Sequence, residues 1–366
     1  IRAGARTYFG ENDTWRLEGY TAYGFTDHKF KYGASGKVLL DPKSRLIVSG
    51  GNRRDIEQLG VSLTATQDVL GRSIASSSLV TVGANNRLTE INLSKLGVEI
   101  EPVTNFRIGL GGTFRTLASA LPEAFSLDYV DPEAPTGIAS TIRQFDFNAL
   151  LIYTPGRKTI GYGVERRGIN ENYSTLLLNY TKGTDGIFGS DFNYSKLQFA
   201  YSQPWQVGGF GRLFSTLEIG KTFGAVPLGL LNVIPGNQTF FSNYGTFPNL
   251  DFYEFVTDTY VSLHLQHNFN GRLFARIPLL RKLNLREVIG LRGVWGQLSD
   301  ENIALSAPAT VSTPLQAPSD KVYYEYSVGI GNIFRILRID FNFRGNYLDS
   351  PNARPFSITG TFGFDF

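Results

Sequence analysis

Histidine is the scarcest side chain with general-base chemistry in this sequence, at positions 28, 264 and 267. His28 follows Asp27 near a predicted turn. A hydrolase needs a histidine beside a nucleophile or a carboxylate, so Asp27–His28 is the one candidate for a hydrolase at the rim of a larger structure. The more ordinary interpretation is a solvated turn. We therefore expect no enzymatic activity.

Metal and cofactor chemistry have equally little support. His264 and His267 are three residues apart in a predicted strand, whose side chains alternate between two faces. The two rings therefore point to opposite sides and cannot share a metal ion. Cysteine is absent from the sequence, which excludes disulfide bonds and thiolate metal sites. We expect no catalytic residues, no metal and no cofactor.

Charged side chains recur instead on one face of predicted strands. Residues 337–347 alternate between apolar and polar side chains, and their polar face carries Arg338, Asp340 and Arg344. Nine residues placed in this way are candidates for lining a lumen: Arg107, Asp146, Lys196, His264, Arg286, Arg292, Arg338, Asp340 and Arg344. They either set ion selectivity in a water-filled lumen or form a crosslinked network that seals a narrow barrel.

The elements that position these residues are amphipathic strands. No stretch approaches the roughly 18 apolar residues of a membrane helix, whereas alternation of apolar and polar residues recurs along the whole chain. In an outer-membrane barrel the apolar face meets lipid and the polar face lines the lumen. We predict fourteen strands: 14–25, 29–40, 44–54, 86–100, 105–119, 141–153, 173–184, 191–204, 211–223, 252–268, 284–297, 322–334, 337–349 and 355–366.

The lengths of the connections predict which ends face outward. Transmembrane barrels have short periplasmic turns and longer outer loops. With a periplasmic C-terminus, the long connections 55–85, 120–140, 224–251 and 298–321 all fall outside. Residues 154–172 and 269–283 are long connections on the periplasmic side, and residues 1–13 and 157–170 have strand character, so the count is fourteen or sixteen. The prediction is an all-β, transmembrane antiparallel β-barrel forming one domain over residues 1–366, with 1–13 as a possible segment before the barrel.

Composition limits the partners. The net charge of +3 argues against a nucleic-acid binder, while 40 glycines and 13% aromatic residues suit a barrel in a bacterial outer membrane. The expected surroundings are the lipid bilayer and lipopolysaccharide. The sequence begins without methionine or a signal peptide, so we read it as a mature fragment that lacks its leader.

Two groups of apolar residues are candidates for binding a protein partner. The first lies in and beside a predicted outer loop and comprises Phe240, Phe241, Tyr244 and Phe247; an aromatic girdle at the membrane interface is its alternative interpretation. The second lies among basic residues in 269–283 and comprises Ile277, Leu279 and Leu280. It either docks an accessory domain or lies on the inner-leaflet surface, and a turn packed under the barrel is its alternative.

The chain ends on an alternating strand with Phe362, Phe364 and Phe366 on one face. This pattern resembles the signal by which barrel-assembly machinery recognises outer-membrane barrels. Its physical content is an amphipathic last strand that can pair with another open strand edge. The alternative is an ordinary core strand at a chain end.

Two longer stretches carry a family resemblance. They are Tyr180–Gly183 with Gly189–Leu197, and His267–Gly271 continuing through Ile277–Leu283 to Gly290–Gly293. They resemble the Bacteroidota envelope family that joins a periplasmic carboxypeptidase-regulatory-like sandwich to a C-terminal barrel of unknown function, over most of the chain from about residue 140. More distantly, they resemble the sixteen-stranded barrels of the surface-antigen and barrel-assembly superfamily. The resemblance implies a missing N-terminal sandwich and supplies no catalytic residues.

The expected function is that of a structural or accessory subunit in a multi-protein envelope complex for assembly, secretion or nutrient uptake. A passive or gated channel is the alternative, and a rim hydrolase is a more remote one.

Overall fold

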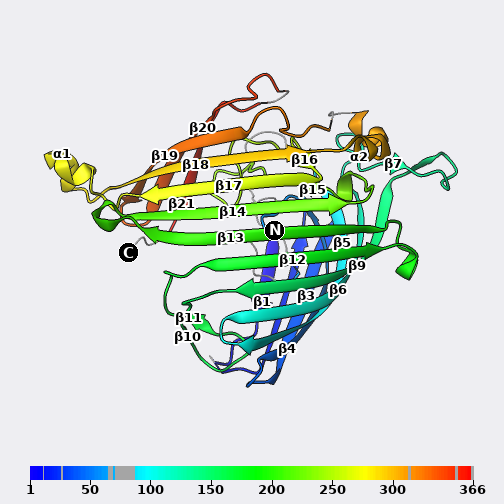
Figure 1. Cartoon of the computed structure of the whole chain (residues 1–366), viewed down its shortest axis with the longest axis horizontal. Coiled ribbons are helices and arrows are strands. Elements are labelled where there is room, and N and C mark those ends of the chain that lie inside the picture. The colour runs from blue at the N-terminus through cyan, green and yellow to red at the C-terminus, as the bar shows by residue number, and fades with distance from the viewer. Residues whose placement is uncertain are drawn as a thin grey trace.

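The computed structural model describes residues 1–10, 12–25, 28–64, 69–70, 87–311, 315–350 and 353–363, and it consists mostly of one large antiparallel sheet. Within the described residues the sheet has fifteen strands, each paired with its neighbours along the chain (Figure 1). The strands are β1 Arg2–Arg6, β2 Trp15–Tyr23, β3 Phe30–Asp41, β4 Leu46–Glu57, β5 Thr89–Val103, β6 Phe106–Ser119, β9 Thr141–Tyr153, β12 Thr175–Thr184, β13 Tyr194–Gln206, β14 Arg212–Phe223, β17 Thr259–Asn268, β18 Arg286–Gln297, β19 Tyr323–Ile333, β20 Leu337–Arg344 and β21 Phe356–Phe362.

The connections hold short additional elements. They include three small hairpins and two short α-helices: β7 Tyr129–Val130 with β8 Ile138–Ala139, β10 Thr159–Ile160 with β11 Arg167–Gly168, β15 Asn232–Val233 with β16 Val256–Thr257, α1 Pro278–Arg281 and α2 Asp300–Leu305. The 3-10 turns are η1 Ile187–Gly189, η2 Gly208–Phe210, η3 Leu228–Leu230, η4 Phe274–Arg276 and η5 Ala307–Val311. None of the helices in the described ranges is long and apolar enough to cross a membrane.

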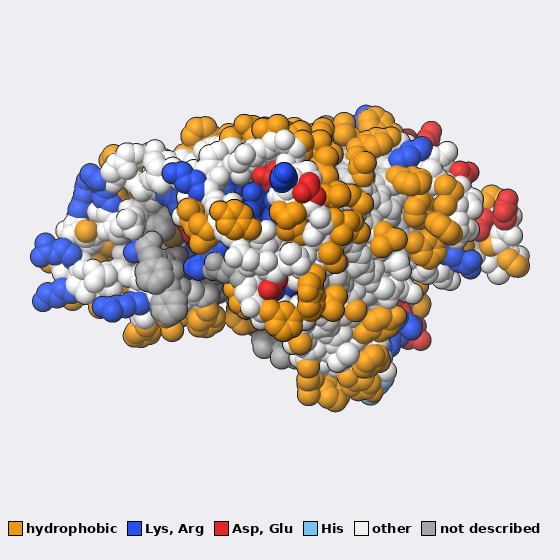
Figure 2. All heavy atoms as spheres, turned by 90° about the horizontal axis from the view of Figure 1, so that it is seen from below, with side chains coloured by type: hydrophobic (Ala, Val, Ile, Leu, Met, Phe, Trp, Pro, Cys, Tyr) orange, Lys and Arg blue, Asp and Glu red, His pale blue; other side chains and the backbone are white. Residues whose placement is uncertain are grey.

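The strands turn apolar side chains outward and polar side chains inward. In β19 the exposed fractions of Tyr324, Tyr326 and Val328 are 40%, 46% and 51%, whereas Tyr323 and Glu325 on the opposite face are wholly buried. Figure 2 shows hydrophobic side chains over much of one face of the molecule, with most charged side chains toward its two ends and a smaller group near its middle. A water-soluble sheet would bury the apolar face, so this arrangement is the one expected of strands whose outer face meets lipid.

The predicted strands exist, and two of their boundaries are clearly wrong. The strand predicted for 252–268 begins only at Thr259, and the one predicted for 337–349 ends at Arg344. Residues 1–13 contribute the short strand β1, so the count is fifteen rather than fourteen. Residues 157–170 form the separate hairpin β10–β11 and do not join the large sheet.

The predicted grouping of the connections is confirmed for those that the structure describes, whereas most of the predicted connection 55–85 lies outside the described residues. The connections that carry β7–β8, β15–β16 and α2 gather at one end of the sheet, while α1 and β10–β11 lie at the other (Figure 1). The second end also holds the tight turns that precede β4, β6, β14 and β20. This end is called the short-turn end below, and the described end of β21 lies there as well, because Phe362 pairs with Leu337.

Segment 161–166 crosses the short-turn end. Glu165 forms ion pairs with Arg6 of β1 and, at 2.5 Å, with Lys37 of β3. The Arg45 guanidinium donates hydrogen bonds to the Gly163 and Val164 carbonyl oxygens at 2.5 and 3.2 Å. This contact explains why the connection between β9 and β12 is long although it lies among short turns.

Candidate functional site

The connection between β14 and β17, residues 224–258, folds inside the curved sheet. We call it the internal connection. Its Tyr253 hydroxyl lies 2.6 Å from the Thr89 hydroxyl of β5, and its Leu230 carbonyl accepts a hydrogen bond from Lys196 of β13 at 2.9 Å. On the far side, its Asn249 N–H donates to Glu325 of β19 at 3.0 Å. A segment that touches strands so far apart around the sheet occupies the space that the sheet encloses.

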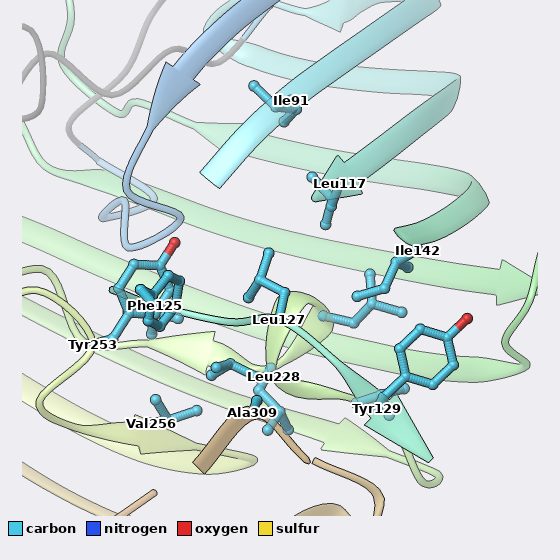
Figure 3. Close-up of a cluster of buried hydrophobic side chains, with 14 of the residues drawn as sticks. Ile91, Leu117, Phe125, Leu127, Tyr129, Ile142, Leu228, Tyr253, Val256 and Ala309 are labelled. Atoms are coloured by element: carbon cyan, nitrogen blue, oxygen red, sulfur yellow. The ribbon is translucent and has the colours of Figure 1, made fainter. Parts of the chain in front are cut away.

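A buried hydrophobic cluster anchors the internal connection. Leu228, Tyr253 and Val256 pack with Leu117 of β6 and Ile142 of β9 (Figure 3). Two other connections at the end opposite to the short-turn end contribute to the same cluster. They supply Phe125, Leu127, Tyr129 and Ala309. Apolar burial of this extent fixes the position of a segment. A second cluster holds Phe247, Phe255 and Tyr323 together.

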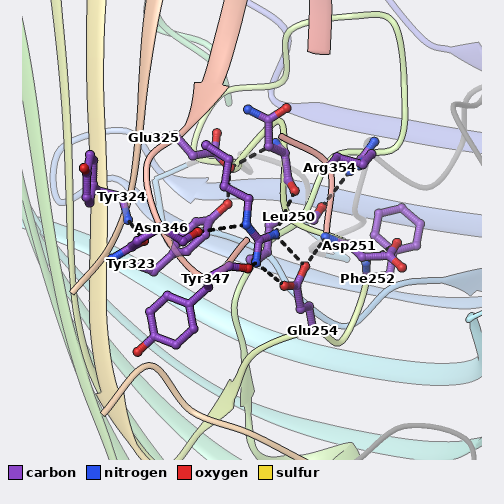
Figure 4. A network of polar contacts seen from close by, with 12 residues as sticks. Leu250, Asp251, Phe252, Glu254, Tyr323, Tyr324, Glu325, Asn346, Tyr347 and Arg354 are labelled. Carbon is purple, nitrogen blue, oxygen red and sulfur yellow. Dashed lines mark hydrogen bonds and ion pairs between the residues drawn. The ribbon is translucent and has the colours of Figure 1, made fainter. Parts of the chain in front are cut away.

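An ion pair joins the internal connection to β20. Arg344 Nη2 lies 2.6 Å from Glu254 Oε1, and both side chains are buried (Figure 4). The same guanidinium donates to the carbonyl oxygens of Asn249, Asn346 and Tyr347 at 3.3, 3.1 and 2.7 Å. Because its donors are shared between the internal connection and residues 345–347, Arg344 holds these two segments together.

Two further groups extend this network. The Tyr323 hydroxyl donates to Glu325 Oε1 at 2.6 Å. Arg354 donates to the carbonyl oxygens of Asn237 and Leu250 at 2.9 and 2.8 Å. Burial raises the pKa of the Asp251 carboxyl, and Arg87, 3.5 Å away, opposes that shift. Burial likewise lowers the pKa of the Arg354 guanidinium.

The internal connection also reaches the edge of the last strand. The Ser242 N–H donates to the Gly360 carbonyl at 2.9 Å, and the Gly360 N–H donates to the Phe240 carbonyl at 2.7 Å. This is a parallel bridge on the edge of β21 that does not pair with β20. The Ser242 hydroxyl adds hydrogen bonds to Thr359 at 2.9 Å and to Asp340 at 3.3 Å.

Several of the predicted lumen residues lie in this interior network. Four of them contact the internal connection: Arg344, Asp340, Lys196 and His264. The His264 ring meets the Phe247 ring edge to face, with 4.8 Å between the ring centroids. Lys196 and His264 line a cavity of about 100 Å³ together with Glu218, which accepts a hydrogen bond from Ser62. This small polar cavity has room for little more than water.

The remaining predicted lumen residues either pair with a side chain on the same or a nearby strand or, among the described residues, form no ion pair. Arg338 pairs with Asp340 at 2.8 Å, and Asp146 pairs with Arg115 at 2.7 Å. Arg292 makes a long hydrogen bond of 3.4 Å to Asn342. Arg107 is partly exposed beside Glu99 at 3.3 Å, and Arg286 lines a separate cavity at the short-turn end.

The four aromatic residues predicted to bind a partner from an outer loop belong instead to the internal connection. Phe247 is fully buried in the second cluster, and Phe241 bridges to β21. The Tyr244 hydroxyl lies 2.6 Å from Thr216 in the middle of β14. Phe240 remains half-exposed within the same segment. Phe247 alone is therefore fully inside, whereas Phe241 and Tyr244 are about half-exposed like Phe240, and the Phe241 ring lies 6.2 Å from that of the exposed Phe362. Of the second group, Ile277 and Leu279 are exposed around α1, and Leu280 is half-buried.

The residues with possible enzymatic chemistry are dispersed. His28 has a positive φ of 50° at the turn between β2 and β3, and Asp27 lies outside the described residues. His264 is inside, whereas His267 Nε2 lies 2.8 Å from the Phe210 carbonyl at the short-turn end. The part of the chain that the structure describes holds no group of three or more acidic, histidine or cysteine side chains suited to a metal ion. Phe362 is exposed, and Phe364 and Phe366 lie outside the described residues.

Sequence reasoning missed the partners inside the internal connection. Glu254 lies in a stretch rich in Phe and Tyr that favours a strand, and its partner Arg344 is 90 residues away. Alternation places Arg344 on an inner face but gives no information about what it meets. Glu254, an acidic residue between the aromatic Tyr253 and Phe255, is the signal that could have indicated a buried ion pair.

Comparisons with known proteins agree with this geometry. Residues 125–301 match the model of a family described as the C-terminal domain of a family of unknown function, DUF5686. No curated protein matches the chain. The chain is similar in structure to BamA from Haemophilus ducreyi lacking POTRA domains 1–3, with a TM-score of 0.54 and 12% identity over 98% of this chain and 69% of that one.

Two further solved structures are similar over most of this chain. CdiB from Acinetobacter baumannii has a TM-score of 0.44 and 9% identity, covering 94% of this chain and 52% of that one. OccK10 (OpdN) from Pseudomonas aeruginosa has a TM-score of 0.36 and 10% identity, covering 94% and 86%. The BamA likeness shows that the fold is that of an outer-membrane type of β-barrel, and the family match covers the centre of the chain.

Proposed function

We propose that this chain is an integral β-barrel of the bacterial outer membrane whose lumen is filled by its own connections. It serves as a structural or accessory subunit of a multi-protein envelope complex for assembly, secretion or nutrient uptake. In this proposal the short-turn end faces the periplasm, and the outer face meets phospholipid and lipopolysaccharide. The barrel-assembly machinery recognises Phe362, Phe364 and Phe366. The proposed origin is a Bacteroidota envelope protein with a sandwich domain before the barrel.

The filled interior carries this proposal. A channel needs a continuous water path lined by polar groups. Here the internal connection contacts strands from β5 to β21, and its hydrophobic cluster and the Arg344–Glu254 pair lie where that path would run. An interior of this kind favours a scaffold over a pore.

The two end strands of the sheet favour protein partners. Among the described residues no ladder joins β1 to β21, and the outer edge of β21 carries only the bridge to Phe241. An unpaired strand edge is a template on which another chain can add a strand. The proposed accessory role uses such an edge, or the exposed apolar residues of α1, to hold a partner.

Planar-bilayer recording of the purified chain tests the filled interior. The wild-type chain is expected to show no stable conductance. A variant in which residues 226–256 are replaced by a short Gly-Ser linker is expected to conduct, because it loses the internal connection's part of the hydrophobic cluster, Glu254, the Phe247 packing and the bridge to β21. Steady open-pore conductance of the wild-type chain would instead support the channel alternative.

Partner binding is tested by gentle solubilisation from the native membrane and native mass analysis. A complex containing the chain is expected, and a lone monomer under all conditions counts against the accessory role. We also propose that the chain is not an enzyme. The substitution His28→Ala is therefore expected to leave lipase and protease assays at their background level, and a loss of measurable hydrolysis would overturn that statement.

A further inference from the structure

The connection between β17 and β18, residues 269–285, projects from the short-turn end and exposes apolar side chains. It carries η4 and α1 and stands out from the sheet at that end (Figure 1). Leu279 is 75% exposed, and Ile277 and Leu283 are about half-exposed. Apolar side chains presented together on a projecting turn are typical of a surface that another apolar phase covers.

The same connection is strongly basic. Between Asn268 and Glu287 it contains five basic residues and no acidic one: Arg272, Arg276, Arg281, Lys282 and Arg286. Glu287 is buried and accepts a hydrogen bond from the Phe274 N–H. Lys and Arg side chains gather at this end of the molecule in Figure 2. The partner that this charge favours is anionic.

A cavity of about 680 Å³ lies between this connection and the neighbouring turn of residues 332–336. Arg281, Arg286 and Arg335 line it, and no acidic residue does. Within the described residues none of the three guanidinium groups forms an ion pair. Asn332 donates to the Asn284 carbonyl at 2.7 Å, which ties the two walls together.

The cavity lies at the end of the sheet where the exposed apolar residues of the strands stop. In β18, Ile289 and Leu291 are exposed on the outward face, and Arg286, on the alternate face, is only about 10 Å along the strand from Ile289. Phe334, beside the cavity in the adjacent turn, is 88% exposed. A lipid bilayer presents acyl chains and then phosphate groups in this order, and basic residues beside apolar ones mark that boundary.

We propose that residues 269–285 and 332–336 form a binding site for the phosphate headgroup of an anionic phospholipid. Arg281, Arg286 and Arg335 contact the phosphate, because guanidinium groups bind phosphate oxygens through paired hydrogen bonds. Ile277, Leu279 and Leu283 enter the acyl-chain region beside it. The inference rests on the proposed membrane insertion and identifies one lipid class that the inserted barrel holds.

The test uses the full chain refolded into vesicles of phosphatidylcholine, with or without phosphatidylglycerol. Folding is followed by the mobility difference between heated and unheated samples on gels. Phospholipids retained after mild detergent extraction are then identified by native mass spectrometry. The wild-type chain is expected to retain phosphatidylglycerol over phosphatidylcholine by roughly tenfold, because each basic residue near an anionic surface contributes several-fold.

The variant R281Q/R286Q/R335Q is expected to lose this preference. The control R143Q/R167Q/K321Q removes the same charge outside the cavity and is expected to keep it. The single variant R335Q changes a residue in an exposed turn and is expected to lose part of the preference for phosphatidylglycerol. It replaces the triple variant in the test if the triple variant does not fold. Equal loss in the control variant would show a general charge effect and would overturn the site.

The remaining outcomes separate this inference from the proposed function. Insertion without any preference for phosphatidylglycerol overturns the lipid site alone. Failure to insert into any vesicle overturns both. Full competition by glycerol 3-phosphate or inorganic phosphate shows a soluble-phosphate site and overturns the lipid assignment. Capture of a protein domain on 269–285, with no lipid preference, likewise overturns it.

Discussion

Arg344 combines in one residue the main features of the interior. Alternation along β20 directs it inward, where it meets Glu254 of the internal connection and three backbone carbonyls. A buried ion pair is not in itself strong evidence for stability, because two charges lose their hydration. Removing one partner, however, leaves the other buried and unpaired, and that is costly.

The substitution Arg344→Met is therefore expected to lower the free energy of unfolding by roughly 3–5 kcal/mol. The double variant R344M/E254M is expected to recover part of this, because no lone carboxylate remains. Urea unfolding in detergent, followed by gel mobility, provides the measurement. The matched control is Arg54→Met, whose side chain pairs with Glu90 at 2.6 Å but is half-exposed. It is expected to cost less than about 1 kcal/mol, and an equal cost at both sites would contradict the role given to Arg344.

At the scale of elements, periodicity predicted where strands run but not what fills the space between them. The inward face of β19 and the outward Tyr324 and Tyr326 followed directly from alternation. Residues 252–258 have the same aromatic composition, yet they pack inside, with Tyr253 at a positive φ of 58°. Alternation with a period of two residues cannot distinguish an apolar strand that faces lipid from an apolar segment that packs inside the barrel. The sequence Arg2–Arg6 gave too weak an alternation for β1 to be predicted with the others.

The bridge between the internal connection and β21 can be tested by crosslinking. The side chains of Ser242 and Thr359 are joined by a hydrogen bond of 2.9 Å, which suits a pair of cysteines. Because the chain has no native cysteine, S242C/T359C is expected to form an intramolecular disulfide on mild oxidation, seen as a mobility shift that reduction reverses.

The control pair S44C/T359C joins β21 to the turn before β4, far away in strand order, and is expected not to crosslink. Equal crosslinking of both pairs, or none in S242C/T359C, would contradict the placement of residues 240–242 on the edge of β21.

At the scale of the whole molecule, the account depends on the direction of each strand face. Composition and alternation were sufficient to predict an antiparallel barrel and the grouping of its connections. They did not predict the filled lumen, because the contacts that fill it join residues far apart in sequence, such as Gln58 with Gly236 at 3.0 Å. The BamA likeness shows the fold alone, so the membrane itself has to be tested on this chain.

The most direct measurement is a spin-label scan of β19 in refolded vesicles, one introduced cysteine at a time from residue 323 to 328. The accessibility of each label to oxygen, which concentrates in lipid, is compared with its accessibility to a water-soluble nickel complex. Tyr324, Tyr326 and Val328 are expected to be reached by oxygen and not by nickel, whereas Glu325 and Ser327 are shielded from both by the interior. Ready access of the nickel complex to positions 324, 326 and 328 would contradict a lipid-facing barrel.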